Sequence, residues 1–179
     1  MSRKIVAGLF VSLDGVVEAP EKWHFPYLSQ EMGAAVGGMY AEADTLLLGR
    51  VTYEAFAEVW PHRTGEMAEA INGIRKVVAS RTLDQVSWNN STLIEGDLVV
   101  AVKELKDRPG GTIAVSGSVG LVRTLLAAGL LDELRVLVHP LVVGTGMRLF
   151  PEGAPPLPLE LVRSATFANG VLDLTYRPA

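Results

Sequence analysis

A glycine turn between a β-rich run and an apolar helical pattern is the first candidate for ligand chemistry. Residues 112–116 are followed by Gly117 and Gly120, and then by leucines and valines at helical spacing. The first amides of a helix lack partners within the helix and carry the positive end of its dipole. This turn could therefore bind a phosphate. A strand–helix turn that binds nothing fits the same residues equally well.

Two more β-rich runs, residues 45–48 and 76–80, end in glycine, hydroxyl or guanidinium groups. The residues concerned are Gly49, Arg50, Thr52, Ser80 and Arg81. Arginine is suited to bidentate contact with phosphate, although Arg50 could instead pair with Glu54. One ligand lying along the carboxyl edge of a parallel sheet would account for all of these strand ends.

Two carboxylates and an aromatic loop are candidates for contact with a second molecule. Asp14 follows the β-rich run 4–12, where a simple Asp-Gly turn is the alternative. Residues 18–29 hold several large aromatic side chains, including Trp23, and this loop should cover either a pocket or the core. Glu31 begins the next helix and could hold a cationic ring edge or supply a proton, but the helix dipole also favours a glutamate there.

Composition excludes several classes of function. The chain has 179 residues, no cysteine and a net charge of −4, with positive and negative residues interspersed. We expect a single domain over residues 1–179, a small-molecule ligand, no nucleic acid, and no thiol chemistry. The N-terminal apolar run is short and interrupted by Asp14, and no run reaches membrane-spanning length, so we expect no membrane partner and a cytoplasmic protein.

Several catalytic signatures are missing. The three histidines stand far apart in the sequence and no HExxH spacing occurs, so no metal site is expected. The chain lacks a G-x-S-x-G elbow, a Walker sequence and a G-x-G-x-x-G turn after its first β-rich run. These absences disfavour hydrolases, kinases and a standard Rossmann domain.

The order of predicted elements indicates an α/β fold with a mixed sheet. Strands and helices alternate up to residue 131, and a mostly β tail follows in which Asn169-Gly170 predicts a hairpin. The expected strands are residues 4–12, 45–48, 76–80, 91–94, 112–116, 133–140, 159–167 and 171–177. The tail should join the edge of the sheet in the antiparallel sense.

A set of motifs in a fixed order resembles the dihydrofolate-reductase-like superfamily, and more closely its RibD C-terminal type. The motifs are Ser12-Leu13-Asp14-Gly15, Leu48-Gly49-Arg50-Val51-Thr52-Tyr53-Glu54, Gly117-Ser118-Val119-Gly120-Leu121, Asp132-Glu133-Leu134, His139-Pro140, Gly144-Thr145-Gly146 and Leu149-Phe150-Pro151. The resemblance covers nearly the whole chain. It implies a three-layer α/β/α domain with a mostly parallel eight-stranded mixed sheet and antiparallel C-terminal strands.

The resemblance also implies NADPH lying across the strand ends. Carried over to this chain, the cofactor's phosphates would meet Gly49, Arg50 and Thr52, and its 2′-phosphate would meet Ser80 and Arg81. The pyrophosphate would lie on the turn formed by Gly117, Ser118, Val119, Gly120 and Leu121. The nicotinamide would lie beside Phe10, Val11 and Ser12. The reaction would be hydride transfer to a C=N or C=O carbon.

We therefore expect an NADPH-dependent reductase of a small heterocyclic or ribosylated substrate, resembling 5-amino-6-(5-phosphoribosylamino)uracil reductase of riboflavin biosynthesis. The alternatives are a dihydrofolate or pterin reductase and a non-catalytic nucleotide-binding protein. Asp14 and Glu31 are the predicted catalytic residues, and Trp23 and Arg148 the predicted substrate contacts. We also expect a homodimer, with residues 134–143 as a candidate interface.

Overall fold

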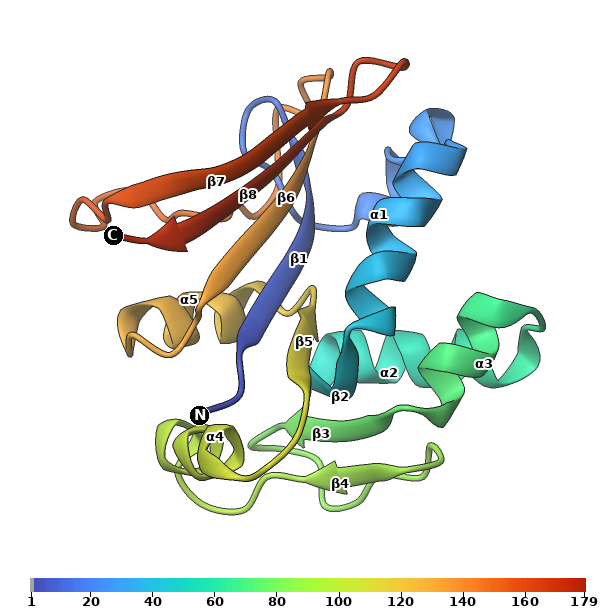
Figure 1. Cartoon of the computed structure of the whole chain (residues 1–179), viewed down its shortest axis with the longest axis vertical. Coiled ribbons are helices and arrows are strands. Elements are labelled where there is room, and N and C mark those ends of the chain that lie inside the picture. The colour runs from blue at the N-terminus through green and yellow to red at the C-terminus, as the bar shows by residue number, and fades with distance from the viewer. Residues whose placement is uncertain (1) are drawn as a thin grey trace.

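The computed structural model, which describes residues 2–179, contains one eight-stranded mixed sheet (Figure 1). The strand order is β4-β3-β2-β5-β1-β6-β8-β7. Neighbours are parallel from β4 to β6, whereas β8 is antiparallel to both β6 and β7. The strands are β1 Ile5–Ser12, β2 Ala43–Gly49, β3 Arg75–Ala79, β4 Ser91–Leu93, β5 Thr112–Ser116, β6 Glu133–His139, β7 Leu159–Thr166 and β8 Leu172–Pro178. The expected fold class is confirmed.

Five α-helices cover the two faces of the sheet. They are α1 Gln30–Ala41, α2 Arg50–Val59, α3 Glu66–Gly73, α4 Leu98–Asp107 and α5 Val119–Ala127. In Figure 1, α4 and α5 lie on one side of the sheet and α1, α2 and α3 on the other. Helix α3 is absent from the elements expected from the sequence. It has only eight residues, of which Ala68 and Ile71 are buried, so its apolar periodicity is short.

The alternation of side chains along β1 explains why both faces must be covered. Ile5, Ala7 and Leu9 pack with α4 and α5, while Val6 packs against Tyr40 of α1 and its neighbours. A strand that is apolar on both faces is typical of a parallel sheet between two helical layers. Short 3₁₀ turns at Pro20–Lys22, Phe25–Tyr27 and Trp60–His62 complete the regular structure.

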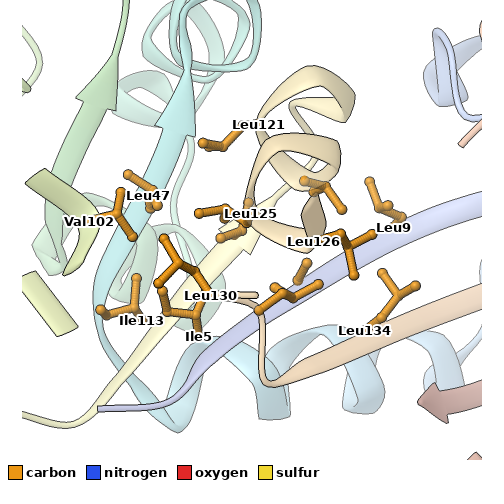
Figure 2. Packing of buried hydrophobic residues seen from close by; sticks show 14 of the residues in the cluster. Ile5, Leu9, Leu47, Val102, Ile113, Leu121, Leu125, Leu126, Leu130 and Leu134 are labelled. Atoms are coloured by element: carbon orange, nitrogen blue, oxygen red, sulfur yellow. The ribbon is translucent and has the colours of Figure 1, made fainter. Parts of the chain in front are cut away.

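The larger core cluster lies between the sheet and α5 (Figure 2). Leu121, Val122 and Leu125 recur at helical spacing on α5, and Val122 and Leu125 are fully buried. The residues labelled in the close-up are Ile5, Leu9, Leu47, Val102, Ile113, Leu121, Leu125, Leu126, Leu130 and Leu134. Burying a side chain such as Leu125 contributes about 1.5–3 kcal/mol. This packing holds the N-terminus of α5 at the edge of the sheet.

The topology leaves two strand edges unpaired, those of β4 and β7. β6, which spans most of the segment considered as a dimer interface, is hydrogen-bonded to β1 on one side and β8 on the other, so it has no free edge. The homodimer stays a prediction. Within residues 2–179, none of the helices combines the length and apolarity needed to cross a membrane.

Among residues 2–179, Lys76 is a buried charged residue without a carboxylate partner. Its side chain is fully buried, and its Nζ donates to the carbonyl oxygens of Asn72 at 2.7 Å and Asn89 at 2.9 Å. The same atom lies 4.2 Å from the ring centroid of Trp88. Burial lowers the pKa of Lys76 to about 8. Because the unfolded chain keeps a higher pKa for lysine, folding favours the neutral amine.

This lysine predicts a pH dependence of stability. Between the folded pKa of about 8 and the unfolded pKa near 10.5, the unfolded state binds more protons, so stability rises with pH through this window. From about pH 7.5 to about pH 9.5, Lys76 should add about 1 to 2 kcal/mol to the free energy of unfolding. Urea denaturation of the wild type and of Lys76→Met measures the effect. Equal slopes with pH in the two proteins would contradict it.

Candidate functional site

A groove of about 1340 Å³ runs along the sheet and contains most of the predicted cofactor residues. Its lining includes the carboxyl ends of β2, β3 and β5 and the first turns of α2 and α5. The predicted residues that line it are Phe10, Gly49, Arg50, Thr52, Ser80, Arg81, Gly117, Ser118, Val119, Gly120 and Leu121. The fold therefore brings together segments that are far apart in the sequence.

The turns before α2 and α5 are joined by the side chain of Ser118. Its Oγ accepts from the Gly49 amide at 2.7 Å and hydrogen-bonds to Thr52 Oγ1 at 2.9 Å. Thr52 Oγ1 also accepts from the Ser118 amide at 3.1 Å. A Cβ atom on Gly49 would lie 2.7 Å from Ser118 Oγ, so only glycine fits. Ser118 itself has a left-handed backbone with φ of 57°, which is unfavourable for a residue with a Cβ.

Arg50, Ser80 and Arg81, which follow β2 and β3, differ in their hydrogen-bond and ion-pair partners. Arg50 pairs with Glu54 at 2.9 Å, which is the alternative left open by the sequence, and both side chains are nearly half exposed. Ser80 Oγ accepts from the amides of Thr82 and Leu83, so its own proton is free to be donated. Within residues 2–179, Arg81 forms no ion pair. The guanidinium of Arg81 is therefore free to bind an anion.

The floor of the groove is tightly packed at Gly8 and carries two hydrogen-bonded hydroxyl groups, those of Tyr40 and Ser116. Gly8 of β1 pairs with Ser116 of β5, and a Cβ atom on Gly8 would lie 2.6 Å from Met39 Sδ. Tyr40 donates its hydroxyl proton to Ser116 Oγ at 2.8 Å. Burial raises the pKa of Tyr40 to about 12, so its phenol stays protonated at neutral pH. Because it accepts from Tyr40, Ser116 can donate its own proton to another group.

An aromatic cluster lies around the carboxyl end of β1. Phe10 stacks on His24 with centroids 4.6 Å apart, and the rings of Trp23 and Tyr27 approach His139 edge-on. His24 and His139, which are distant in sequence, have centroids 6.3 Å apart. Burial lowers the pKa of both rings, and His139 lowers that of His24 further. Val17 and the beginning of the aromatic loop, residues 18–21, line the groove.

Asp14 lies outside the groove lining, and its carboxylate is hydrogen-bonded to Ser12 and to the loop after β6. Its carboxylate accepts from the Ser12 hydroxyl at 2.6 Å and from the amides of Val143 at 3.0 Å and Gly144 at 2.8 Å. These hydrogen bonds lower the pKa of Asp14 to about 2. The carboxylate is therefore ionised at neutral pH, where it anchors the loop after β6. Its catalytic role stays a prediction.

Glu31 and Trp23 also lie outside the groove lining. Glu31, in the first turn of α1, accepts from the Ala168 amide in the β7–β8 turn at 3.2 Å. Trp23 is buried, and its Nε1 donates to the Glu18 carbonyl at 3.1 Å. Both contacts hold segments around the groove in place. The roles expected for these residues in catalysis and substrate binding stay predictions.

Three further predicted residues, Val11, Ser12 and Arg148, are not part of the groove lining. Val11 packs in the core on the α5 side of the sheet, and Ser12 is buried with its hydroxyl bound to Asp14. Arg148 donates from Nε to the Asp14 carbonyl at 3.1 Å and lines a separate cavity of about 550 Å³. These residues are close to the groove in sequence or space but do not form its surface.

The structure adds groove residues that were not predicted. Arg135 of β6, Arg163 of β7 and Asp173 of β8 line the same groove, beyond β1. The alternation Leu172-Asp173-Leu174-Thr175 does predict a strand with one polar face. Nothing in the sequence says that this face lines a groove, because that depends on β8 pairing with β6.

The family comparison matches the RibD C-terminal domain model to residues 3–172. A relative in Bacillus subtilis (strain 168), the uncharacterized protein YyaP, is 29% identical over 180 residues, covering 97% of this chain and 94% of that protein. A putative riboflavin biosynthesis protein from Shewanella sp. PV-4 has a similar structure, with a TM-score of 0.76 at 20% identity, covering 100% of this chain and 99% of that chain.

Two enzymes of known type share the fold. The diaminohydroxyphosphoribosylaminopyrimidine deaminase/5-amino-6-(5-phosphoribosylamino)uracil reductase of Thermotoga maritima gives a TM-score of 0.70 at 15% identity, covering 99% of this chain and 57% of that chain. Dihydrofolate reductase from Enterococcus faecalis, complexed with NADP(H), gives 0.66 at 17%, covering 99% of both chains. The chain belongs to the RibD C-terminal domain family and has the dihydrofolate-reductase-like fold.

Proposed function

We propose that this protein is an NADPH-dependent reductase that transfers hydride to a small heterocyclic or ribosylated substrate. The observation that carries the proposal is the convergence of the turns at Gly49, Ser80 and Gly117 on one groove. Convergent amides and guanidinium groups at strand ends are suited to a phosphorylated dinucleotide. Membership of a family related to reductases supports the same assignment.

The residues at these turns fit NADPH in chemistry as well as position. Gly117 is left-handed, with φ of 65°, and a Cβ atom there would lie 3.2 Å from Thr52 Oγ1, so the turn depends on glycine. A Cβ atom on Gly120 would meet nothing within 4 Å, so the backbone of the first turn of α5 is open to a ligand. Arg81 and the Ser80 hydroxyl offer the donors that a 2′-phosphate needs.

The chain's own residues would orient the reaction. When bound, the cofactor supplies the hydride. Gly8 and Phe10 form the groove floor beside β5, where a flat ring can lie close to the backbone. Ser116, which accepts from Tyr40, can donate a hydrogen bond to the oxygen or nitrogen that becomes negative as hydride arrives. Val36 of α1 and Phe56 of α2 give the groove apolar walls, which would reduce the contact of a bound ring with water.

Cofactor titration and turnover assays test this proposal. The wild-type protein should bind NADPH more tightly than NADH, and bound cofactor should raise its melting temperature. Oxidation of NADPH, followed at 340 nm, should occur with the ribosylaminouracil phosphate. Turnover of dihydrofolate instead would favour a pterin reductase. Binding without turnover of either substrate would favour a nucleotide-binding protein, and absence of cofactor binding would overturn the proposal.

Arg81→Glu should remove the preference for NADPH over NADH. Loss of a charge-assisted contact with the 2′-phosphate costs about 1.5–3 kcal/mol, which corresponds to a loss of roughly 10- to 160-fold in NADPH affinity. NADH affinity should change little. Titration of cofactor fluorescence measures both constants. Arg177→Glu is the matched control, since Arg177 pairs with Glu160 away from the groove lining. Selectivity that survives in Arg81→Glu would show that another residue reads the 2′-phosphate.

Gly49→Ala should weaken NADPH binding through Ser118. The added Cβ would lie 2.7 Å from Ser118 Oγ, so the two turns must move apart, at a cost of about 1–3 kcal/mol in stability. The double variant Gly49→Ala/Ser118→Gly removes the clash and should recover part of the loss. Urea denaturation and NADPH titration provide the readouts. Gly33→Ala is the control, because a Cβ atom there meets nothing within 4 Å. A double variant no better than Gly49→Ala would argue against this contact as the cause.

A further inference from the structure

Two histidines that are far apart in the sequence meet at the carboxyl end of β1. His24 belongs to the aromatic loop, residues 18–29, and His139 is the last residue of β6. Their ring centroids lie 6.3 Å apart. His139 is fully buried and His24 is 9% exposed. We name these two residues the histidine pair. Neither has a role in the proposed function.

Each ring of the histidine pair has a buried nitrogen without a hydrogen-bond partner. These atoms are Nδ1 of His24 and Nε2 of His139. Nδ1 of His139 lies 2.8 Å from the Leu137 carbonyl oxygen, which can only accept, so Nδ1 carries the proton of the neutral ring and Nε2 carries none. Protonation would place a positive charge on a buried ring. A buried charge is costly unless a group of opposite charge is paired with it.

Aromatic rings connect the histidine pair to the groove. His24 stacks on Phe10 with centroids 4.6 Å apart, and Trp23 and Tyr27 approach His139 edge-on at 5.1 Å and 5.4 Å. Trp23, His24 and Tyr27 all belong to the aromatic loop, so these contacts attach the loop to β1 and β6. Phe10 also lines the groove. Movement of the loop would therefore change the surroundings of Phe10.

The groups closest to the pair do not offset the cost of burying it. Burial is the main cause that lowers the pKa of both rings from the usual 6.5, and His139 lowers the pKa of His24 further. The Glu21 carboxylate opposes the shift at His24, and the carbonyls of Leu137 and Val11 oppose it at His139, but the pKa of each ring stays lowered.

Other titratable groups on the surrounding segments have partners of their own or bring no charge. Asp14 after β1 and Glu31 of α1 accept from backbone amides, and Asp173 of β8 is paired with an arginine. Tyr27 contacts His139 from the aromatic loop, but a phenol is uncharged in acid. The histidine pair is therefore most compatible with the folded loop when both rings are neutral.

We propose that the neutral histidine pair holds the aromatic loop closed at one edge of the groove, and that protonation of the pair in mild acid releases the loop. Residues 18–21 of this loop line the groove, and Phe10, which packs on His24, lines it as well. Release would remove part of the groove lining and the support of the Phe10 ring. The effect on cofactor binding rests on the proposed function, whereas the movement of the loop does not.

Opening of the loop should become more favourable as the pH falls below 6.5. A ring released into water has a pKa near 6.5 and binds a proton more readily than the buried ring, so the open state gains protons in this range. Above about pH 7.5 the rings are neutral in both states, and opening should not depend on pH. At about pH 5, each histidine can favour opening by up to about 30-fold.

Hydrogen exchange of backbone amides, measured by NMR on the full chain, tests the inference. The amides of Trp23, His24 and Tyr27 donate to carbonyls within the loop. After correction for the intrinsic exchange rate, their protection should fall at least about fivefold from about pH 7.5 to about pH 5. Protection in β1 and α5 should stay constant. The ring chemical shifts of His24 and His139 should report protonation over the same pH range.

His24→Phe removes one titrating ring and keeps an aromatic ring against Phe10. Within residues 2–179, the His24 side chain makes no hydrogen bond that phenylalanine would lose. The loss of loop protection in acid should therefore be at least about twofold smaller in this variant than in the wild type. His62→Gln is the matched control, because His62 is exposed and lines neither cavity. It should lose loop protection as the wild type does.

Several results would overturn the inference. Loop protection that does not change with pH would do so, as would an equal loss in the wild type and His24→Phe. Loss of protection throughout the sheet at the same pH would show acid unfolding of the whole chain instead of release of the loop. Opening of the loop while both rings stay neutral would assign the release to another group.

Titration with NADP⁺, the oxidised form of the proposed cofactor, separates this inference from the proposed function. Its affinity should fall between about pH 7.5 and about pH 5 by a larger factor in the wild type than in His24→Phe. The comparison cancels titration of the cofactor's own phosphate. A protein whose loop opens in acid but which does not bind the cofactor at any pH would overturn the reductase proposal alone. A protein that binds the cofactor while loop protection stays constant with pH would overturn this inference alone.

Discussion

Parallel pairing of β5 with both β1 and β2 is the constraint on which the rest of the molecule depends. It places the carboxyl ends of strands from the two halves of the chain at one edge of the sheet. The turns that follow β2 and β5 then meet, and Ser118 joins them through the Gly49 amide and Thr52. A ligand that lies across these turns could accept hydrogen bonds from amides of both turns without movement of the chain. Such preorganisation lowers the cost of ordering donors on binding.

The two faces of the sheet carry different kinds of side chains. On the face toward α5, most of the buried side chains are apolar and fill the core. On the face toward α1, Gly8, Ser116 and Asp173 interrupt the apolar pattern and line the groove. Because these positions lack large apolar side chains, the hydrophobic core on that side of the sheet is smaller. Functional sites commonly depart from the best packing in this way.

Elements with strong local signals could be predicted from the sequence, whereas contacts between distant segments could not. The eight strands follow from β-rich runs. The convergence of the turns after β2, β3 and β5 on one groove could be predicted because glycine, hydroxyl and guanidinium groups directly follow these parallel strands. The position of Arg135, Arg163 and Asp173 on the groove could not, since it depends on the register of β6, β8 and β7, which local patterns do not determine. The meeting of His24 and His139 depends on tertiary structure in the same way.

Asp14 and Glu31 have carboxylates of the type suited to catalysis, and their hydrogen bonds also connect distant segments of the fold. Asp14 and Glu31 each accept hydrogen bonds from backbone amides that lie more than 100 residues away in sequence, at Val143 and Ala168. Without these acceptors, the amides of two loops beside the groove would lack their partners. Local sequence patterns do not show which distant amides a carboxylate will bind, so these two contacts could not be predicted from the sequence. Asp173 differs from both, because its partner is a side chain and it is buried on the groove itself.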